Sequence, residues 1–426
     1  MLRTLSRALA VGLAATALSA QTRTPVAAPP QAQAPTPTIE RDALHAPGTD
    51  VRVYLLTMGT GPHVEQMFGH SSIWVRDTIT HRDTVINWGV FDASEPNFIP
   101  HFLKGLMLYS VGGNRMVDVL YNYRYWNRSV TSQELNLTPT QKDTLLSIMQ
   151  TNMVPENIHY RYDYFVDNCA TRPRDILDRV LGGQLRIGAD SLTTTSYRFH
   201  ALRLMQENTP LTLGVDIGLG EPSDRPITKW QELFLPQKLH DWVATREIRD
   251  STGAMKPLAL SDRVLFQSTR ATDPEAPPTF AWLWLVGGVL AAAFVALGVA
   301  ARRSRGARTG AAVVMTIWAA VCGILGVLVA ALWLFTDHRF AHSNENLLLF
   351  QPLWLIVAFS LPMTLMSGRA QTLTKRLLAL FVGLGAVALL LHVVGQSRQS
   401  NVPIIGFALL PTIALLMVVS GPRRAG

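Results

Sequence analysis

Two short stretches of this 426-residue chain hold side chains that can carry out covalent chemistry. In FGHSSIWV, His70 follows a glycine at the start of a predicted strand, which places its imidazole at a strand edge rather than in a core. In DNCATRPRD, a polar turn leads into a predicted helix, and Cys169 lies at or near its first turn. A helix N-terminus and a nearby imidazole both lower a thiol pKa, so Cys169 is a candidate nucleophile and His70 its base. The alternative is that Cys169 is a structural thiol, buried by chance.

A thiol–imidazole pair needs a third polar group that orients the imidazole. If His70 begins one strand, the neighbouring predicted strand, residues 84–88, supplies Asn87 as the best placed candidate. Glu65 and Asp77 are the next candidates. For all three residues, an ordinary turn or solvent-exposed role is the alternative.

Other catalytic chemistries have weaker support in the sequence. The only two cysteines are Cys169 and Cys322, and Cys322 lies in the middle of an apolar run, so no disulfide is expected between them. No HExxH or CxxC pattern accompanies His63, His70 and His81, so neither a metal nor another cofactor is expected. The sequence also contains no glycine-rich phosphate loop and no GxSxG motif.

The two reactive stretches belong to one predicted domain, residues 49–267, which is long enough to bury its own core. It mixes predicted strands with predicted helices, which indicates an α+β fold. Tyr121, Tyr123 and Tyr125 alternate along the chain, which favours a further strand. The other predicted strands are residues 51–57, 72–76 and 84–88, and the predicted helices are residues 138–153, with Thr138 as N-cap, and 171–181.

The composition indicates a membrane region after this domain. The chain is 48% hydrophobic and 16% charged, whereas soluble domains are about 25% charged. Within residues 279–426, five apolar runs each approach the roughly 20 residues that a membrane-spanning helix needs. These runs are residues 280–301, 311–335, 347–366, 377–395 and 402–420.

The charges between these runs predict the orientation in the membrane. The two loops after the first and third runs, together with the C-terminal tail, hold nine Arg and Lys residues, whereas the other two loops hold only Arg339 and Arg398. Positively charged loops stay in the cytoplasm, so residues before 280 are expected outside and the C-terminus inside. The net charge of +8 is explained by this topology, and no nucleic-acid partner is expected.

The N-terminal residues 1–20 predict an exported protein with the same orientation. Arg3 and Arg7 precede a short apolar run that ends in small residues, as in a signal peptide, although an uncleaved anchor is the alternative. Residues 21–48 are rich in Pro, Ala and Thr and are expected to form a flexible linker. A second linker, residues 268–278, leads into the first apolar run.

These motifs resemble two related groups of proteins. A Gly-His strand followed much later by an Asn-Cys helix resembles the permuted branch of the papain-like NlpC/P60 fold. More closely, the chain resembles the Lnb family of bacterial lipoprotein N-acyltransferases, which have an exported thiol domain followed by a multi-span membrane domain. The resemblance extends from Arg52 onward and is carried by FGHSSIWVRD, INWGVFD with Asn87 and Gly89, residues 97–105, DNCATRPRD, ELFLP and the loop 338–346.

The resemblance implies transfer of a fatty acyl chain from a phospholipid to the α-amino group of a diacylglyceryl-modified lipoprotein Cys. It assigns Cys169 as the nucleophile and His70 as the base, with Asn87 as the third residue. The same resemblance implies a location in the bacterial inner membrane, with the thiol domain on the periplasmic side. The exported loop that contains His338, His342 and Asn344 is a candidate for binding lipid head groups, with a solvated loop as the alternative.

Acyl transfer through a thioester needs two hydrogen-bond donors for the tetrahedral oxyanion. The backbone N–H of Cys169 is one candidate, and the side chains of Asn168, Tyr162 or Tyr164 supply the other, unless they serve only the turn. The same Cys–His pair suits a phospholipase or a cell-wall peptidase, and a non-catalytic envelope protein is a third interpretation. Five spans exceed what anchoring a cell-wall hydrolase requires, which favours a lipid substrate.

Overall fold

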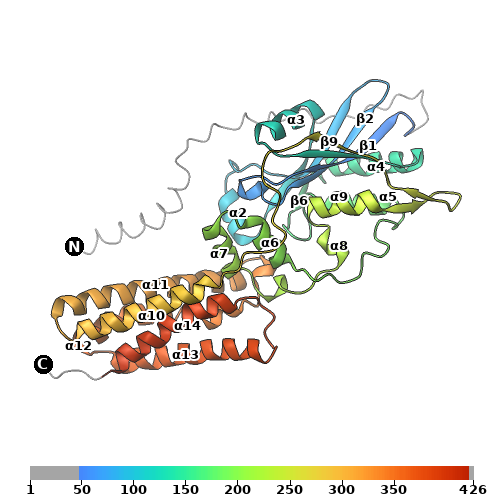
Figure 1. Ribbon diagram of the computed structural model, residues 1–426. Coiled ribbons are helices and arrows are strands. Elements are labelled where there is room, and N and C mark those ends of the chain that lie inside the picture. The colour runs from blue at the N-terminus through green and yellow to red at the C-terminus, as the bar shows by residue number, and fades with distance from the viewer. Residues whose placement is uncertain (1–47, 422–426) are drawn as a thin grey trace. The chain divides into compact units, whose positions relative to one another are not determined.

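The computed structural model of the protein describes residues 48–421. The predicted signal peptide and nearly all of the first predicted linker lie outside the described residues, as do Arg423 and Arg424. The described chain begins with a mixed α/β region and continues into a series of apolar helices (Figure 1). This order agrees with the predicted mixed domain followed by a helical membrane region.

A seven-stranded antiparallel sheet forms the centre of the α/β region. Three of its strands confirm those predicted from the sequence. His70 is the first residue of β2, which lies in the interior of the sheet, between β1 and β3. The strands, in the spatial order of the sheet, are β6 (His159–Arg161), β4 (Leu108–Asn114), β3 (Asp83–Val90), β2 (His70–Asp77), β1 (Val51–Met58), β5 (Val130–Leu135) and β9 (Ala259–Phe266).

Both predicted helices of this region are confirmed. Helix α4 (Pro139–Met153) begins with a capping box, in which Thr138 and Gln141 each bond the backbone N–H of the other. Helix α5 (Thr171–Val180) follows the Cys169 turn. The remaining short elements are η1 (Val64–Gln66), α2 (Phe98–Lys104), α6 (Tyr197–Met205), α7 (Thr209–Gly218), η2 (Glu221–Ser223), α8 (Lys229–Glu232), α9 (Pro236–Thr245), β7 (Glu247–Arg249) and β8 (Met255–Pro257).

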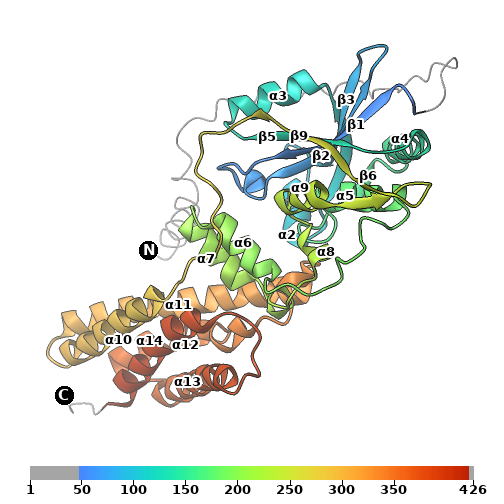
Figure 2. The same cartoon turned by 45° about the vertical axis from the view of Figure 1, so that its right-hand side comes forward.

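The strand predicted around Tyr121–Tyr125 is wrong, because this segment is helix α3 (Met116–Tyr125). In a strand the three tyrosines would share one face, whereas in the helix Tyr121 and Tyr125 are exposed and Tyr123 packs against a buried cluster. Met116 and Val119 supply the buried side of the helix. Figure 2 shows α3 on one side of the sheet, and α5 and α9 on the other.

Four of the five apolar runs form helices long enough to cross a membrane. The run 347–366 differs, because its first residues form a 3-10 turn and the helix α12 (Trp354–Ser367) has only 14 residues. Such a helix is about 21 Å long, less than the roughly 30 Å of the hydrocarbon core, so a fifth span stays a prediction. The four long helices are α10 (Trp282–Ala301), α11 (Arg305–Phe335), α13 (Gln371–Val393) and α14 (Val402–Ser420), and the short turns before α12 are η3 (Arg339–Ala341) and η4 (Glu345–Leu348).

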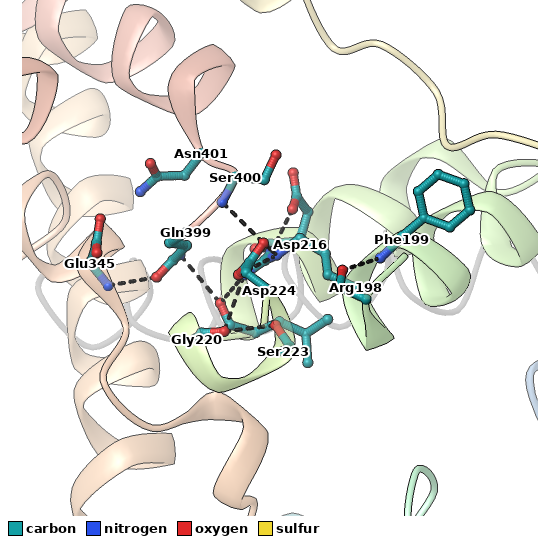
Figure 3. A network of polar contacts seen from close by, with 12 residues as sticks. Arg198, Phe199, Asp216, Gly220, Ser223, Asp224, Glu345, Gln399, Ser400 and Asn401 are labelled. Carbon is teal, nitrogen blue, oxygen red and sulfur yellow. Dashed lines mark hydrogen bonds and ion pairs between the residues drawn. The ribbon is translucent and has the colours of Figure 1, made fainter. Parts of the chain in front are cut away.

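A buried polar network joins α6, α7 and η2 to the loops between the apolar helices (Figure 3). Arg198 is 2% exposed and donates to the carboxylates of Asp216 and Asp224. Asp224 also accepts from the backbone N–H of Ser400, just before α14. The amide of Asn344 donates to three carbonyls at the C-terminal end of α7. These bonds satisfy helix-end carbonyls that lack partners within the helix, and they tie the two regions together.

Candidate active site

Strands β2 and β3 bring His70 and Asn87 together. Their antiparallel register pairs Ser72 with Asn87, and the imidazole Nε2 of His70 lies 3.1 Å from Asn87 Oδ1. The Ser72 hydroxyl donates to the same oxygen at 2.5 Å. Asn87 Nδ2 in turn donates to the backbone O of Val85 and, at 3.0 Å, to Asn114 Oδ1. These contacts define Asn87 Oδ1 as an acceptor, so His70 donates from Nε2 and keeps a lone pair on Nδ1 for a proton.

The turn before α5 holds Cys169 one residue ahead of the N-cap residue Ala170. Asn168, which is 5% exposed, accepts from the backbone N–H groups of Ala170 and Thr171. Its Nδ2 donates to the carbonyls of Tyr164 and Phe234. Both amide hydrogens of Asn168 are thus engaged, which fits a positioning role for this residue and not an oxyanion donor.

Cys169 lies against the end of β2 at which His70 is located. The backbone N–H of Ser71 hydrogen-bonds the Cys169 sulfur. Gly89 has a φ of +87°, and β3 shifts its pairing register there. A side chain at Gly89 would lie 3.2 Å from the Tyr162 ring and 3.9 Å from Cys169 Cβ. Glycine at this position therefore leaves the space in which the nucleophile candidate approaches the sheet.

The expectation of a lowered thiol pKa is wrong. Although Cys169 is partly exposed, burial among its neighbours raises its pKa to about 11, and this effect outweighs the Ser71 amide and the positive charge of Arg128. Burial also lowers the pKa of His70 to about 4, against the opposing hydrogen bond to Asn87. At neutral pH the pair therefore consists of a neutral thiol and a neutral imidazole that is ready to accept a proton.

Arg128 is a component of the site that the sequence did not indicate. It is 6% exposed, its Nε donates to the carbonyl of Gly59 at 2.9 Å, and its guanidinium lies 4.6 Å from the centre of the Tyr123 ring. Its positive charge lowers the pKa of both Cys169 and His70. A buried cation whose charge reaches the sulfur stabilises negative charge that develops there or on a substrate oxygen.

Two further polar residues of the site were missed for different reasons. Ser72 could have been recognised, because a strand period of two places it on the same face as His70. Asn114 could not, because its contact with Asn87 depends on how β3 and β4 are paired. Arg128 follows helix α3, and nothing in its local sequence marks it as buried.

The other candidate residues make different contacts, and Asp77 lies far from His70. Asp77 is at the opposite end of β2, about 23 Å along the strand, and accepts from two backbone N–H groups of the hairpin turn. Glu65 is exposed on η1. Tyr164 packs against Phe340, and burial raises its pKa. Across residues 48–421, no group of three or more His, Cys, Asp or Glu side chains is placed to hold a metal ion.

The three candidates on the exported loop make different contacts. His338 Nε2 lies 2.9 Å from the carbonyl O of Phe102, and its ring stacks 6.1 Å from Tyr164. His342 Nε2 lies 3.1 Å from the carbonyl O of Thr336 in its own loop. Asn344 is 2% exposed and bonded to α7, so its amide serves the protein interior and is not open to a lipid head group.

Two ion pairs attach this loop to the segment that precedes Cys169. Arg161 pairs with Asp337, and Asp163 pairs with Arg339 at 2.9 Å. The other carboxylate oxygen of Asp163 accepts from the backbone N–H groups of Phe165 and Val166. The loop between α11 and α12 thus contacts the turn that carries the nucleophile candidate.

Comparison with known families gave two matches. Residues 45–205 match the Lnb N-terminal periplasmic domain, and residues 275–421 match the Lnb transmembrane domain. The first match contains His70, Asn87 and Cys169, and the second contains the apolar helices α10 to α14. Searches of curated proteins and of solved structures each gave no match.

Proposed function

The chain belongs to the Lnb family, and from this membership we propose that it is a lipoprotein N-acyltransferase. The proposed reaction moves a fatty acyl chain from a phospholipid to the α-amino group of a diacylglyceryl-Cys lipoprotein, through a thioester on Cys169. The observation that supports it most strongly is that Cys169 lies against Ser71 and Gly89, close in the strands to the bonded pair His70 and Asn87, on a turn that contacts a loop between membrane helices.

In the first half-reaction, His70 Nδ1 accepts the thiol proton while the Cys169 sulfur attacks the ester carbonyl carbon of the phospholipid. The backbone N–H of Cys169 and the hydroxyl of Tyr162 are the candidate oxyanion donors, and the charge of Arg128 supports them. The C–O bond then breaks, the departing alcohol takes the proton from His70, and the acyl group remains on sulfur.

In the second half-reaction, the neutral α-amino group of the lipoprotein attacks the thioester carbonyl. His70 accepts a proton from the attacking nitrogen and returns it to the departing sulfur, so an amide forms and the free thiol is restored. The order of events is ping-pong, because the lysophospholipid leaves before the amine reacts. Asn87 keeps the imidazole in the tautomer that both steps need.

The proposal extends to the fold and the location. The exported domain is proposed to be a permuted papain-like domain of the NlpC/P60 type, residues 49–267, in which the His strand precedes the Cys helix. Residues 279–426 are proposed to cross the bacterial inner membrane five times, with α12 in the third crossing and the C-terminus in the cytoplasm. The unequal distribution of Arg and Lys between the loops supports this orientation.

Mass spectrometry of lipoprotein N-termini tests the reaction. Wild type, Cys169→Ala and the control Cys322→Ala are expressed in bacteria depleted of their own N-acyltransferase. We expect an added acyl mass on the diacylglyceryl-Cys amine with wild type and with Cys322→Ala, and none with Cys169→Ala.

An added acyl mass with Cys169→Ala would support N-acyl transfer but would show that Cys169 is not the nucleophile. If all three proteins are expressed and none adds the mass, the N-acyltransferase proposal fails. Release of free fatty acid or cleavage of muropeptides by wild type then identifies a phospholipase or a peptidase, and neither product would indicate a non-catalytic protein.

A further inference from the structure

Helix α2 exposes a continuous apolar stripe. Ile99, Phe102 and Leu103 follow one another at helical spacing and are between 44% and 60% exposed, and Leu106, just after the helix end at Gly105, is 38% exposed. None of the seven residues of α2 is buried, and Leu108, just beyond the helix, is 62% exposed. A stripe of this kind on a protein surface indicates an apolar partner.

The contacts of α2 place this stripe close to the end of a membrane helix. The backbone N–H of Asp337 donates to the carbonyl of Lys104 at 2.8 Å, and Asp337 comes two residues after Phe335, the last residue of α11. Gly105 ends α2 with a φ of +74°, and a side chain there would lie 2.9 Å from the backbone N of His338. Because α2 is about 10 Å long, its whole length lies near the end of α11.

A row of aromatic rings leads from α2 to the sheet. Successive ring centres are separated by 6.4 Å, 5.6 Å, 5.1 Å and 4.5 Å. The last ring is the one that lies beside Gly89 and Cys169. The rings, in order, belong to Phe102, Phe98, Phe91, Tyr109 and Tyr162.

We propose that α2 and Leu108 dip into the exported leaflet of the membrane that α11 spans, and that the aromatic row guides a lipid acyl chain from there to Cys169. The lipid surface is the occupant because α11, a helix long and apolar enough to cross a membrane, ends at Phe335, two residues before the Asp337 that α2 contacts. Lys104 is exposed on the same helix, at a position where a cationic side chain attracts head-group phosphates. The guidance of the acyl chain rests on the proposed function, whereas the insertion of α2 does not.

Insertion is tested with the full chain in lipid nanodiscs that hold one protein each. An environment-sensitive fluorophore is attached at Ile99→Cys in a Cys169→Ser, Cys322→Ala background, and the discs contain phosphatidylethanolamine, phosphatidylglycerol and a spin-labelled lipid quencher. The control site is Ile79→Cys, an isoleucine in the β2–β3 turn that is 50% exposed.

We expect blue-shifted emission and strong quenching at residue 99, and neither at residue 79. Equal emission and quenching at the two sites would overturn the proposal. Blue-shifted emission at residue 99 that appears only in discs holding two chains would assign the stripe to a second copy. That result would also overturn the proposal.

Guidance is tested by comparing two acyl donors for Cys169. In Ile99→Asp/Leu103→Asp, we expect the ratio of the acylation rate from vesicle phospholipid to that from a soluble short-chain ester to fall about tenfold or more, since two apolar contacts with lipid are lost. Ile79→Asp should keep the wild-type ratio. An unchanged ratio in the α2 variant would reject guidance. If wild type takes no acyl group from phospholipid, the proposed function fails, whereas the quenching experiment still decides insertion.

Discussion

The exported domain contacts the membrane region at two places that differ in burial. At the first, around Arg198 and Gln399, the polar side chains are almost fully buried, and Figure 3 shows their hydrogen bonds. At the second, next to the Cys169 turn, the Arg161–Asp337 pair is more than half exposed on both sides, and so is the side chain of Arg339. Buried charges are strongly destabilising when one partner is removed, whereas exposed pairs contribute little. The first contact therefore holds the two regions together, whereas the second, beside the site, can break with little loss of stability.

The largest expected effect comes from removing Arg198, whose partners lie in the exported domain and which orients Asp224 for its bond to Ser400. Arg198→Met leaves two buried carboxylates, Asp216 and Asp224, without their cation and should lower the free energy of unfolding by about 3–5 kcal/mol. The measurement is thermal or denaturant unfolding of the full chain in detergent. The control is Arg225→Met, which removes the exposed partner of Glu221 and should cost less than about 1 kcal/mol. Equal losses in the two variants would show that burial does not set the cost of removing the cation.

A second prediction concerns the thiol beside the exposed contact. Because the pKa of Cys169 is raised to about 11, its thiolate fraction at neutral pH is small and grows as pH rises. Alkylation of Cys169 by iodoacetamide, followed by mass spectrometry, should accelerate about tenfold per pH unit between roughly pH 7 and 9. The neutral imidazole of His70, with its pKa near 4, adds no positive charge over this range. A rate that is already constant at pH 7 would indicate a preformed thiolate–imidazolium pair and contradict the prediction.

The smallest effect on stability is expected at the exposed contact itself. Arg339→Gln removes the ion pair with Asp163 and should change the free energy of unfolding by less than about 1 kcal/mol. The rate of Cys169 acylation should nevertheless fall, because Asp163 also orders the turn that precedes the nucleophile candidate. The two measurements are unfolding of the full chain and the initial rate of thioester formation. A large loss of stability, or an unchanged rate, would show that the second contact does not act on the turn.

Periodicity along the chain was enough to predict most of the local structure around the site. Strands β1, β2 and β3 and helices α4 and α5 were recognised from alternation, capping residues and helix-stopping glycines. The segment of helix α3 was misjudged, because the spacing of Tyr121, Tyr123 and Tyr125 suits a strand while only the third dimension shows which of them is buried. The third apolar run, residues 347–366, is defined by composition alone, which does not reveal that its helix begins only at Trp354.

The sequence by itself predicted Cys169 and His70 as the candidate chemical centre, Asn87 as the residue that orients His70, and a membrane region, because these predictions follow from residue types and short-range spacing. Only the tertiary structure decided that Arg128 and Asn114 join the site, that burial raises the thiol pKa, and that α2 lies beside the end of α11. The reason is physical. Desolvation, strand register and contacts between distant segments depend on which surfaces meet after folding, and residue order alone does not specify that.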